Sequence, residues 1–201
     1  KIYLALSPLF QNISGGLLHT NIAVCTLFGA VSGSSLSTAA AVGSVAYPEM
    51  TERGYDRQMV VGSLAGGGTL GLLIPPSLSL LIYGALTETS IGRLFLAGIL
   101  PGIILASMFM VYIYLRCRQN PLLAPFSESQ LKITLIIKNI LAIWPFLIVV
   151  IAIMGSISFG IATPTEAAGV GVIATIILGK FWGSLTLKKL VEAIYSCLLY
   201  T

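Results

Sequence analysis

A first cluster of small polar residues, which could bind an ion, stands within otherwise apolar sequence. It reads Ser32-Gly33-Ser34-Ser35, followed by Ser37 and Thr38. Hydroxyl and free carbonyl oxygens are neutral, hard ligands that suit a small cation such as sodium, and glycine lets the backbone turn its carbonyls toward the ion. Without a carboxylate, such a site holds a monovalent ion weakly, as a coupling ion requires. Close helix packing by small residues is the competing interpretation.

A second cluster, from Gly66 to Ser77, reads Gly-Gly-Gly-Thr-Leu-Gly-Leu-Leu-Ile-Pro-Pro-Ser. It lies within an uncharged stretch, residues 58–87, that as one helix would measure about 45 Å, against roughly 30 Å of hydrocarbon. Pro75 and Pro76 lack amide donors and each glycine weakens a helix, so we expect two half-helices that meet inside the membrane. The break would expose carbonyls on one side and amides on the other, as secondary transporters require for ions and substrate. A proline-kinked span packed by glycines is the alternative.

The composition is that of an integral membrane protein. Hydrophobic residues make up 56% of the chain and charged residues 9%. Eleven basic and seven acidic side chains are too few to cover the surface of a soluble globule of 201 residues. The net charge of +4 does not indicate nucleic acid, because the basic residues stand singly or in pairs at the ends of apolar segments. Cys25, Cys117 and Cys197 are far apart and lack a CxxC pattern, which indicates small hydrophobic side chains.

The apolar segments predict an all-α, polytopic membrane protein with a re-entrant helical hairpin and discontinuous transmembrane helices. The runs 17–31 and 35–47 are each too short to cross a bilayer, which favours a hairpin over residues 17–47. A water-exposed loop, Pro48 to Arg57, precedes the broken helix 57–87. A helix over 91–115, an interfacial segment over 131–138 and a span over 139–159 follow. Thr163, Pro164 and Glu166 have the spacing of a helix start, in which Glu166 caps backbone amides.

The basic residues predict the orientation. If the hairpin enters from the cytoplasm, Arg93 is the only basic residue expected on the outer side of the membrane. Lys1 cannot be assigned to either side. The basic residues on the cytoplasmic side are then Arg53, Arg57, Arg116, Arg118, Lys132, Lys138, Lys180, Lys188 and Lys189. His19, near a helix start, is expected to be an interfacial side chain.

The motifs closely resemble the large membrane subunit of TRAP (tripartite ATP-independent periplasmic) transporters, in order and over nearly the whole chain. They are Phe28-Gly-Ala-Val-Ser-Gly-Ser-Ser-Leu-Ser-Thr-Ala-Ala-Ala-Val-Gly-Ser44, Pro48-Glu-Met, Arg53-Gly-Tyr-Asp56, Gly67-Gly-Thr-Leu-Gly-Leu-Leu-Ile-Pro-Pro-Ser77, Tyr83-Gly, Leu86-Thr-Glu-Thr-Ser-Ile-Gly92, Leu94-Phe-Leu-Ala-Gly98, Pro101-Gly102 and Thr163-Pro-Thr-Glu-Ala-Ala168. The resemblance implies a sodium-coupled symporter of the bacterial inner membrane with an elevator-type fold. It also implies a small membrane subunit and a periplasmic substrate-binding protein that delivers an organic acid, such as a C4-dicarboxylate or sialic acid.

The resemblance also implies the site and the division of the chain. The expected sodium ligands are Ser32, Gly33, Ser34, Ser35, Gly68, Thr69 and Gly71, and the expected substrate-binding residues are Ser35, Thr38, Ile74, Pro75, Pro76 and Ser77. Sodium would be the coupling ion, with no organic cofactor. Residues 1–92 would be transport-domain sequence, 93–130 a transmembrane helix with a cytoplasmic connection, and 131–201 an interfacial arm, two transmembrane helices and the start of a second inverted repeat. We expect the sequence to be an internal part of a longer protein.

Three other classes of protein remain to be weighed. An ion channel could also use broken helices, and a different sodium-coupled dicarboxylate carrier could work without a binding protein. An enzyme is not expected, because the sequence has no nucleophile with a base, no paired acids at a useful spacing and no phosphate-binding loop.

Overall fold

The computed structural model describes residues 2–125, 144–181 and 185–200, and all its regular elements within these ranges are helical. They are α1 (Ile2–Phe10), α2 (Leu17–Ser32), α3 (Ser35–Glu52), α4 (Arg57–Leu73), α5 (Leu78–Leu86), α6 (Ile91–Gln119), the 3-10 turn η1 (Pro121–Leu123), α8 (Trp144–Ser158), α9 (Pro164–Phe181) and α10 (Leu187–Tyr200). The prediction of an all-α chain is confirmed for this part. The predicted interfacial segment 131–138 and the first residues of the span 139–159 lie outside the described residues.

Three stretches of the described chain are long and apolar enough to cross a membrane: Arg57–Leu86, which holds α4 and α5, Ile91–Gln119 and Pro164–Phe181. The helices α2 and α8 are also apolar but shorter. Most large aliphatic side chains on α6 face outward, among them Leu100 at 66% and Met108 at 62% exposure. A soluble protein would bury such side chains, whereas a membrane covers them with lipid. The structure therefore supports a polytopic membrane protein.

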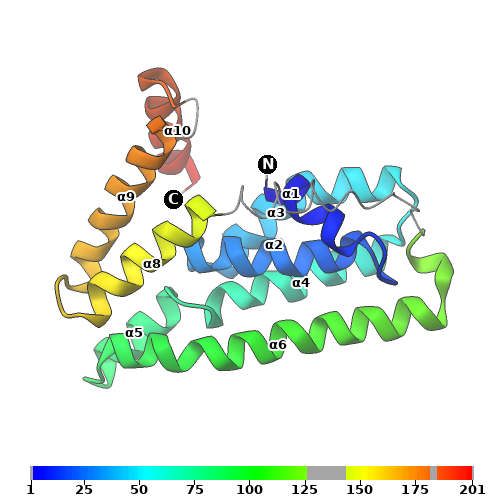
Figure 1. Ribbon diagram of the computed structural model, residues 1–201, viewed down its shortest axis with the longest axis horizontal. Helices are drawn as coiled ribbons and strands as arrows, with labels where there is room; N and C mark the ends of the chain where they lie inside the picture. Colours follow the sequence, from blue (N-terminus) through cyan, green and yellow to red (C-terminus); the bar gives the residue numbers. More distant parts are fainter. Residues whose placement is uncertain (1, 126–143, 182–184, 201) are drawn as a thin grey trace.

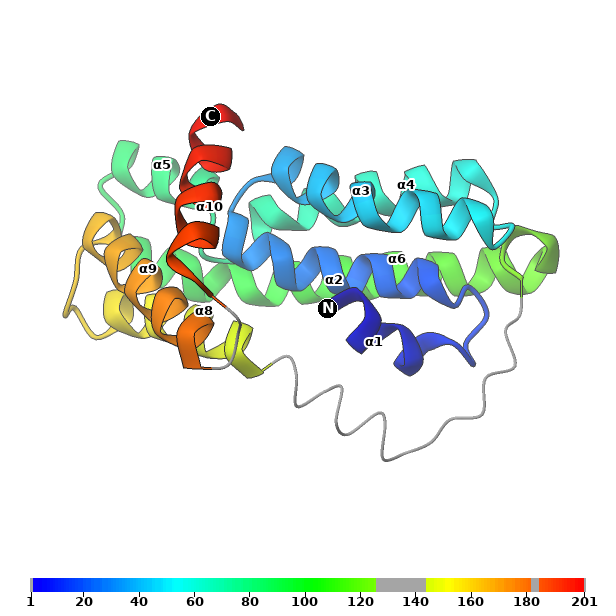
Figure 2. The same ribbon diagram turned by 90° about the horizontal axis from the view of Figure 1, so that it is seen from above.

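Helices α2, α3 and α4 form a compact bundle, and α6 runs beside the whole length of this bundle (Figures 1 and 2). Small residues set the spacing within the bundle. A Cβ atom on Gly29 of α2 would stand 2.7 Å from the Cα of Gly71 on α4, and one on Gly67 would stand 2.9 Å from the Cβ of Cys25. Two helices can approach this closely only where side chains are missing, so the glycines hold α4 against α2.

The uncharged stretch is broken once, at residues 74–77, and this corrects the expectation that the glycines also belong to the break. Gly66 to Gly71 are helical within α4. Each glycine costs a helix about 1 kcal/mol, which close packing against α2, α3 and α6 offsets. The prolines have no such compensation. Ile74 is extended, as a residue before proline prefers, and the Ser77 hydroxyl oxygen accepts a hydrogen bond from the Leu80 amide at 3.2 Å to begin α5.

Helix α3 continues through Pro48 to Glu52, so the predicted hairpin end at residue 47 and the loop from residue 48 are also corrected. A proline within a helix removes its own amide donor and crowds the carbonyl four residues earlier, but the last turn of α3 has other support. The Arg53 guanidinium donates to the Glu49 carboxylate at 2.7 Å, and the Thr51 hydroxyl donates to the Tyr47 carbonyl at 2.7 Å. The connection to α4 is therefore only four residues long, from residue 53 to residue 56.

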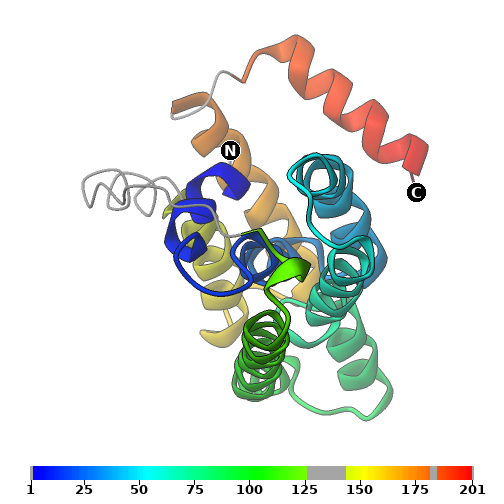
Figure 3. The ribbon, with the colours of Figure 1, turned by 90° about the vertical axis from the view of Figure 1, so that its right-hand side faces the viewer.

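Helices α8 and α9 form an antiparallel pair near the end of the bundle where α6 begins (Figure 1). The predicted helix start is confirmed. The Thr163 hydroxyl oxygen accepts from the Glu166 amide at 3.4 Å, and the Glu166 carboxylate accepts from the Thr163 amide at 2.8 Å. Glu166 thus caps backbone amides, as expected. Helix α10 crosses the direction of α6 (Figures 2 and 3).

Candidate functional site

The turn of the α2–α3 hairpin touches the break between α4 and α5. Gly33, which ends α2, has φ 60° and ψ 9°, a left-handed conformation that favours glycine. Its carbonyl oxygen accepts a hydrogen bond from the Leu78 amide at 3.4 Å. A Cβ atom on Gly33 would stand 3.1 Å from the carbonyl oxygen of Pro76. The two polar clusters, which are distant in the sequence, are therefore adjacent in space.

Oxygen atoms converge inside the hairpin turn. The hydroxyl oxygens of Ser32 and Thr38 lie 2.7 Å apart, and the Thr38 hydroxyl donates to the Ser34 carbonyl at 2.7 Å. Thr38 is fully buried. The backbone of Gly71 on α4 closes this group, because a Cβ atom there would stand 3.0 Å from the Thr38 hydroxyl and 3.1 Å from the Ser34 carbonyl. These neutral oxygens are the type of ligand that a small hard cation prefers.

The neighbouring candidate residues approach this oxygen group through their backbone, and the Ser34 side chain serves as a helix cap. The Ser34 hydroxyl oxygen begins α3 by accepting from the Ser37 amide at 3.4 Å. A Cβ atom on Gly68 would stand 3.0 Å from the Ser35 carbonyl and 2.9 Å from the Cβ of Ala39. Gly68 and Gly71 therefore let α4 approach the first turn of α3 without a side chain between them.

Two of the predicted residues face away from this group. Thr69 is on the exposed face of α4, and its hydroxyl donates to the Gly66 carbonyl at 2.6 Å. Ile74 packs against α6, because a Cβ atom on Gly102 would stand 2.7 Å from its Cγ1. Ser77 is 2% exposed and uses its hydroxyl to cap α5. The structure thus brings together the hairpin turn, Gly68, Gly71, Pro76 and Ser77, but not Thr69 or the Ile74 side chain.

A cavity of about 570 Å³ lies beside the hairpin turn and the break. Ser32, Gly33, Pro76 and Ser77 form its polar edge, and α8 and α9 supply apolar walls. Among the described residues that line it, no side chain is charged. A small organic molecule fits such a volume, and hydroxyl groups and backbone dipoles would have to orient it.

Sequence reasoning missed the walls of this cavity. Val149 and Ile153 on α8 and Ala168 on α9 line it, although they lie more than 70 residues from the nearest predicted site residue. Thr175 on α9 also lines it, with its hydroxyl donating to the Gly171 carbonyl at 2.8 Å. Apolar wall residues carry no distinctive pattern, because every membrane-spanning helix is rich in them. Thr175, a hydroxyl residue in the middle of an apolar run, was the one available signal.

His19 lies away from the site, in the first turn of α2. Its side chain is 3% exposed. Its ring stacks on Phe10 with centroids 6.0 Å apart, and its Nε2 lies 2.9 Å from the Ser14 carbonyl oxygen. Helix α1, whose packing the sequence did not predict, covers it. Within the described residues, His19 belongs to no group of three His, Cys, Asp or Glu side chains that could hold a metal.

Comparison with known proteins identifies the family. Residues 2–201 match the family described as "Tripartite ATP-independent periplasmic transporter, DctM component". The chain is 42% identical over 170 residues to the "C4-dicarboxylate TRAP transporter large permease protein DctM" of Pseudomonas aeruginosa. These residues cover 85% of this chain and 39% of that protein. It is 41% identical over 171 residues to the "Ectoine TRAP transporter large permease protein TeaC" of Halomonas elongata, covering 83% of this chain and 38% of that protein.

A third relative is the "Sialic acid TRAP transporter permease protein SiaT" of Haemophilus influenzae, 35% identical over 193 residues, which are 94% of this chain and 30% of that protein. The chain thus spans between 30% and 39% of the length of these three relatives. The resemblance predicted from the motifs is confirmed. The chain belongs to the DctM family of large TRAP transporter permeases, which are membrane transporters and not enzymes.

Proposed function

We propose that this chain is part of the large subunit of a sodium-coupled symporter that imports an organic acid across the bacterial inner membrane. The observation that carries the proposal is the contact between the hairpin turn and the helix break, through Gly33 and Leu78. Interrupted helices at one point in a membrane protein leave backbone dipoles free to act on ions and substrate. Membership of the family supplies the class of transporter.

The proposed sodium site is the oxygen group inside the hairpin turn. Its ligands would be the hydroxyls of Ser32 and Thr38 and the carbonyl oxygen of Ser34, which already lie within hydrogen-bonding distance of one another. Gly68 and Gly71 keep α4 close enough to shield the ion from lipid. Because none of these ligands is charged, the ion would bind weakly enough to leave on the other side.

The proposed substrate site is the adjoining cavity. A carboxylate of the substrate would lie near Ser77 and the first amides of α5, where the helix dipole favours negative charge. No described lining side chain offers a positive charge, so the sodium ion would supply the counter-charge. Sodium and substrate would then increase each other's affinity, which is the thermodynamic basis of coupling. The names of the relatives suggest a C4-dicarboxylate, ectoine or sialic acid as the substrate.

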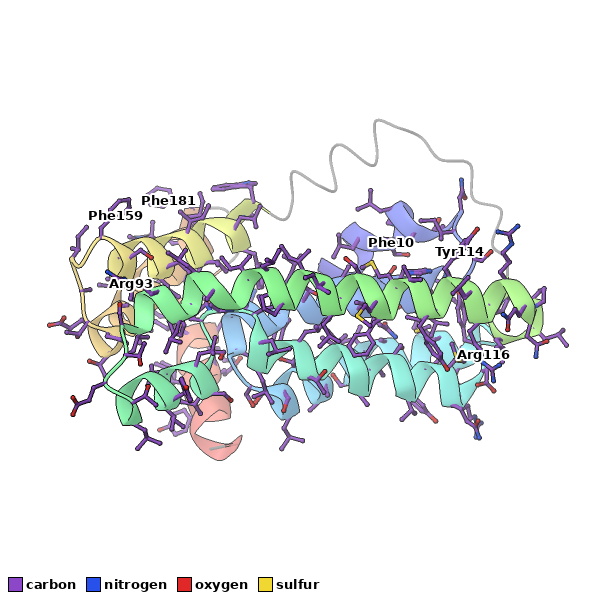
Figure 4. The ribbon with its side chains drawn as sticks, turned by 90° about the horizontal axis from the view of Figure 1, so that it is seen from below. Phe10, Arg93, Tyr114, Arg116, Phe159 and Phe181 are labelled. Carbon is purple, nitrogen blue, oxygen red and sulfur yellow. The ribbon has the colours of Figure 1, made fainter. Side chains whose placement is uncertain are left out.

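The proposed setting is a multi-pass protein in which the hairpin re-enters from the cytoplasm. Arg93 and Arg116 lie at opposite ends of α6 (Figure 4), and the positive-inside rule places the Arg116 end in the cytoplasm. As in the family, a small membrane subunit and a periplasmic binding protein would complete the system. Residues 1–92 would move as part of an elevator-type transport domain, and the chain would hold about one inverted repeat with part of the next.

Reconstitution of the complete transporter in proteoliposomes tests this function. Uptake of the organic acid should require a sodium gradient and the binding protein, and preloaded substrate should accelerate uptake by counterflow. A channel would give flux that does not saturate and shows no counterflow. Full uptake without the binding protein would favour the alternative of an independent sodium-coupled carrier.

A further inference from the structure

A second cavity, of about 620 Å³, lies between α4 and α6, at the opposite end of the bundle from the break. Its wall on α6 is a single stripe of apolar side chains at helical spacing: Leu105, Met108, Phe109, Tyr112 and Ile113. The stripe from Leu105 to Arg116 measures about 16 Å, close to the depth of one leaflet of the hydrocarbon core. We call this cavity the α4–α6 groove.

Gly62 forms the floor of the groove on α4. A Cβ atom on Gly62 would meet nothing within 4 Å, whereas one on Gly66, a turn later, would meet the ring of Phe109 at 3.5 Å. Met108 and Tyr112 are 62% and 59% exposed on the opposite wall. The groove is therefore open at Gly62 and closes toward Gly66, and in a membrane its apolar surface faces lipid acyl chains.

The end of the groove is polar and carries one charge of each sign. Arg116 of α6 and Asp56 at the start of α4 both line it, together with Gln58. Within the described residues neither forms an ion pair, in contrast to Arg53, which pairs with Glu49 at 2.7 Å. Asp56 uses Oδ1 to accept from the Met59 amide at 2.9 Å, and its second oxygen accepts no hydrogen bond from the described residues.

We propose that the α4–α6 groove binds a glycerophospholipid with an ethanolamine headgroup from the cytoplasmic leaflet. One acyl chain would lie along the apolar stripe over Gly62, the phosphate would contact Arg116, and the ammonium group would contact Asp56. A zwitterionic headgroup matches two opposite charges that are not paired with each other. An anionic headgroup without an amine, such as phosphatidylglycerol, would satisfy Arg116 but leave Asp56 repelling the phosphate. The choice of leaflet rests on the proposed orientation.

Lipid binding to the complete, purified transporter tests the proposal. Native mass spectrometry would count phosphatidylethanolamine and phosphatidylglycerol retained in sodium-free buffer without substrate, so the result does not depend on transport. Gly62→Leu fills the groove and should lower the retention of phosphatidylethanolamine about tenfold, and Arg116→Gln should lower it severalfold. Asp56→Asn keeps a good helix N-cap and should remove the preference for phosphatidylethanolamine over phosphatidylglycerol.

Two matched controls keep folding defects apart from lost binding. Gly169→Leu adds the same side chain at a glycine of α9 that also has open space around it and does not line the groove. Arg118→Gln removes a neighbouring positive charge that instead contacts Tyr114, with 3.2 Å between the guanidinium and the hydroxyl oxygen. Both should retain phosphatidylethanolamine as the unchanged protein does.

Three results would overturn the proposal. One is equal retention of both lipids by the unchanged protein, and another is a loss of lipid in Gly169→Leu as large as in Gly62→Leu. The third concerns the occupant of the groove. A photoreactive amino acid in place of Met108 should form an adduct with lipid, and an adduct with a protein segment alone would show that a polypeptide covers the groove.

Discussion

The Leu78 amide donates a hydrogen bond to the carbonyl oxygen of Gly33 at 3.4 Å, and this contact ties the first turn of α5 to the turn of the α2–α3 hairpin. Gly33 lies in the chain between Ser32 and Ser34, which supply proposed sodium ligands, and both Gly33 and Leu78 line the cavity. A change in the hairpin turn therefore displaces the start of α5 as well. Substitutions at separate positions test this dependence.

Gly33→Ala should impair sodium-driven uptake more than it impairs stability. The left-handed conformation would cost about 1 kcal/mol for alanine, and the new methyl group would press on the Pro76 carbonyl, 3.1 Å from it. Gly160→Ala is the matched control, because Gly160 has φ 68° but nothing within 4 Å of an added Cβ atom. Thermal unfolding should show the backbone cost in both variants and a somewhat larger loss in Gly33→Ala, whereas uptake by the complete transporter should fall mainly in Gly33→Ala. Equal losses of uptake would contradict the contact.

Gly68→Val should weaken the sodium dependence of uptake without preventing insertion into the membrane. A Cβ atom at this position would stand 2.9 Å from the Cβ of Ala39 and 3.0 Å from the Ser35 carbonyl, so α3 would have to move away from α4. Membrane fractionation would report insertion, and uptake at several sodium concentrations would report the ion dependence. Gly43→Val is the control, because an added Cβ atom there meets only the Leu64 side chain, at 3.6 Å. Unchanged sodium dependence in Gly68→Val would count against the assigned site.

Ser34→Ala should have a smaller effect on sodium than a loss of the Thr38 hydroxyl. The Ser34 side chain caps α3, while its carbonyl, which the substitution leaves in place, belongs to the proposed ligands. Loss of an N-cap costs about 1 kcal/mol of stability. We therefore expect a lowered unfolding temperature with a modest rise in the sodium concentration that gives half-maximal uptake. A sodium dependence abolished without any loss of stability would show that the hydroxyl itself is a ligand.

Two buried polar side chains in the bundle should respond to substitution in opposite directions. The Asn21 amide donates to the Ser63 hydroxyl at 2.9 Å and to the Met50 sulfur at 3.2 Å, so Ser63→Ala should destabilise the protein by about 1–3 kcal/mol because it removes the stronger of these two acceptors. The Thr20 hydroxyl is buried without a hydrogen-bond partner among the described residues, so Thr20→Val should be neutral or stabilising. Thermal unfolding in detergent would measure both. A marked destabilisation by Thr20→Val would indicate a bound water or ion at that hydroxyl.

The elements around the site could be predicted from local signals in the sequence. The helix boundary at Ser32 follows from a glycine that takes a left-handed conformation, and the α9 start follows from the spacing of Thr163 and Glu166. The break at Pro75 follows from the missing amide donors. Each of these signals acts within a few residues, so no tertiary contact is needed to recognise it.

The remaining features depend on contacts between distant segments. Gly66 to Gly71 stay helical because α2, α3 and α6 pack closely on them, which no local propensity indicates. Thr69 faces away from the hairpin because the helix continues through it, and this sets the direction of its side chain. The walls of the cavity from α8 and α9, and the α4–α6 groove, are made by apolar residues whose partners only the fold defines.

Uptake by the complete transporter carrying Thr38→Val tests the central claim most directly. Valine keeps the shape of the side chain but removes the hydroxyl that lies 2.7 Å from both the Ser32 hydroxyl and the Ser34 carbonyl. Thr26→Val is the control, because that hydroxyl donates to the Ile22 carbonyl of its own helix, at 2.8 Å, and lies outside the proposed site. The sodium concentration for half-maximal uptake should rise about tenfold in Thr38→Val and stay unchanged in Thr26→Val. The same sodium dependence in both variants and in the unchanged protein would contradict a sodium site in the hairpin turn.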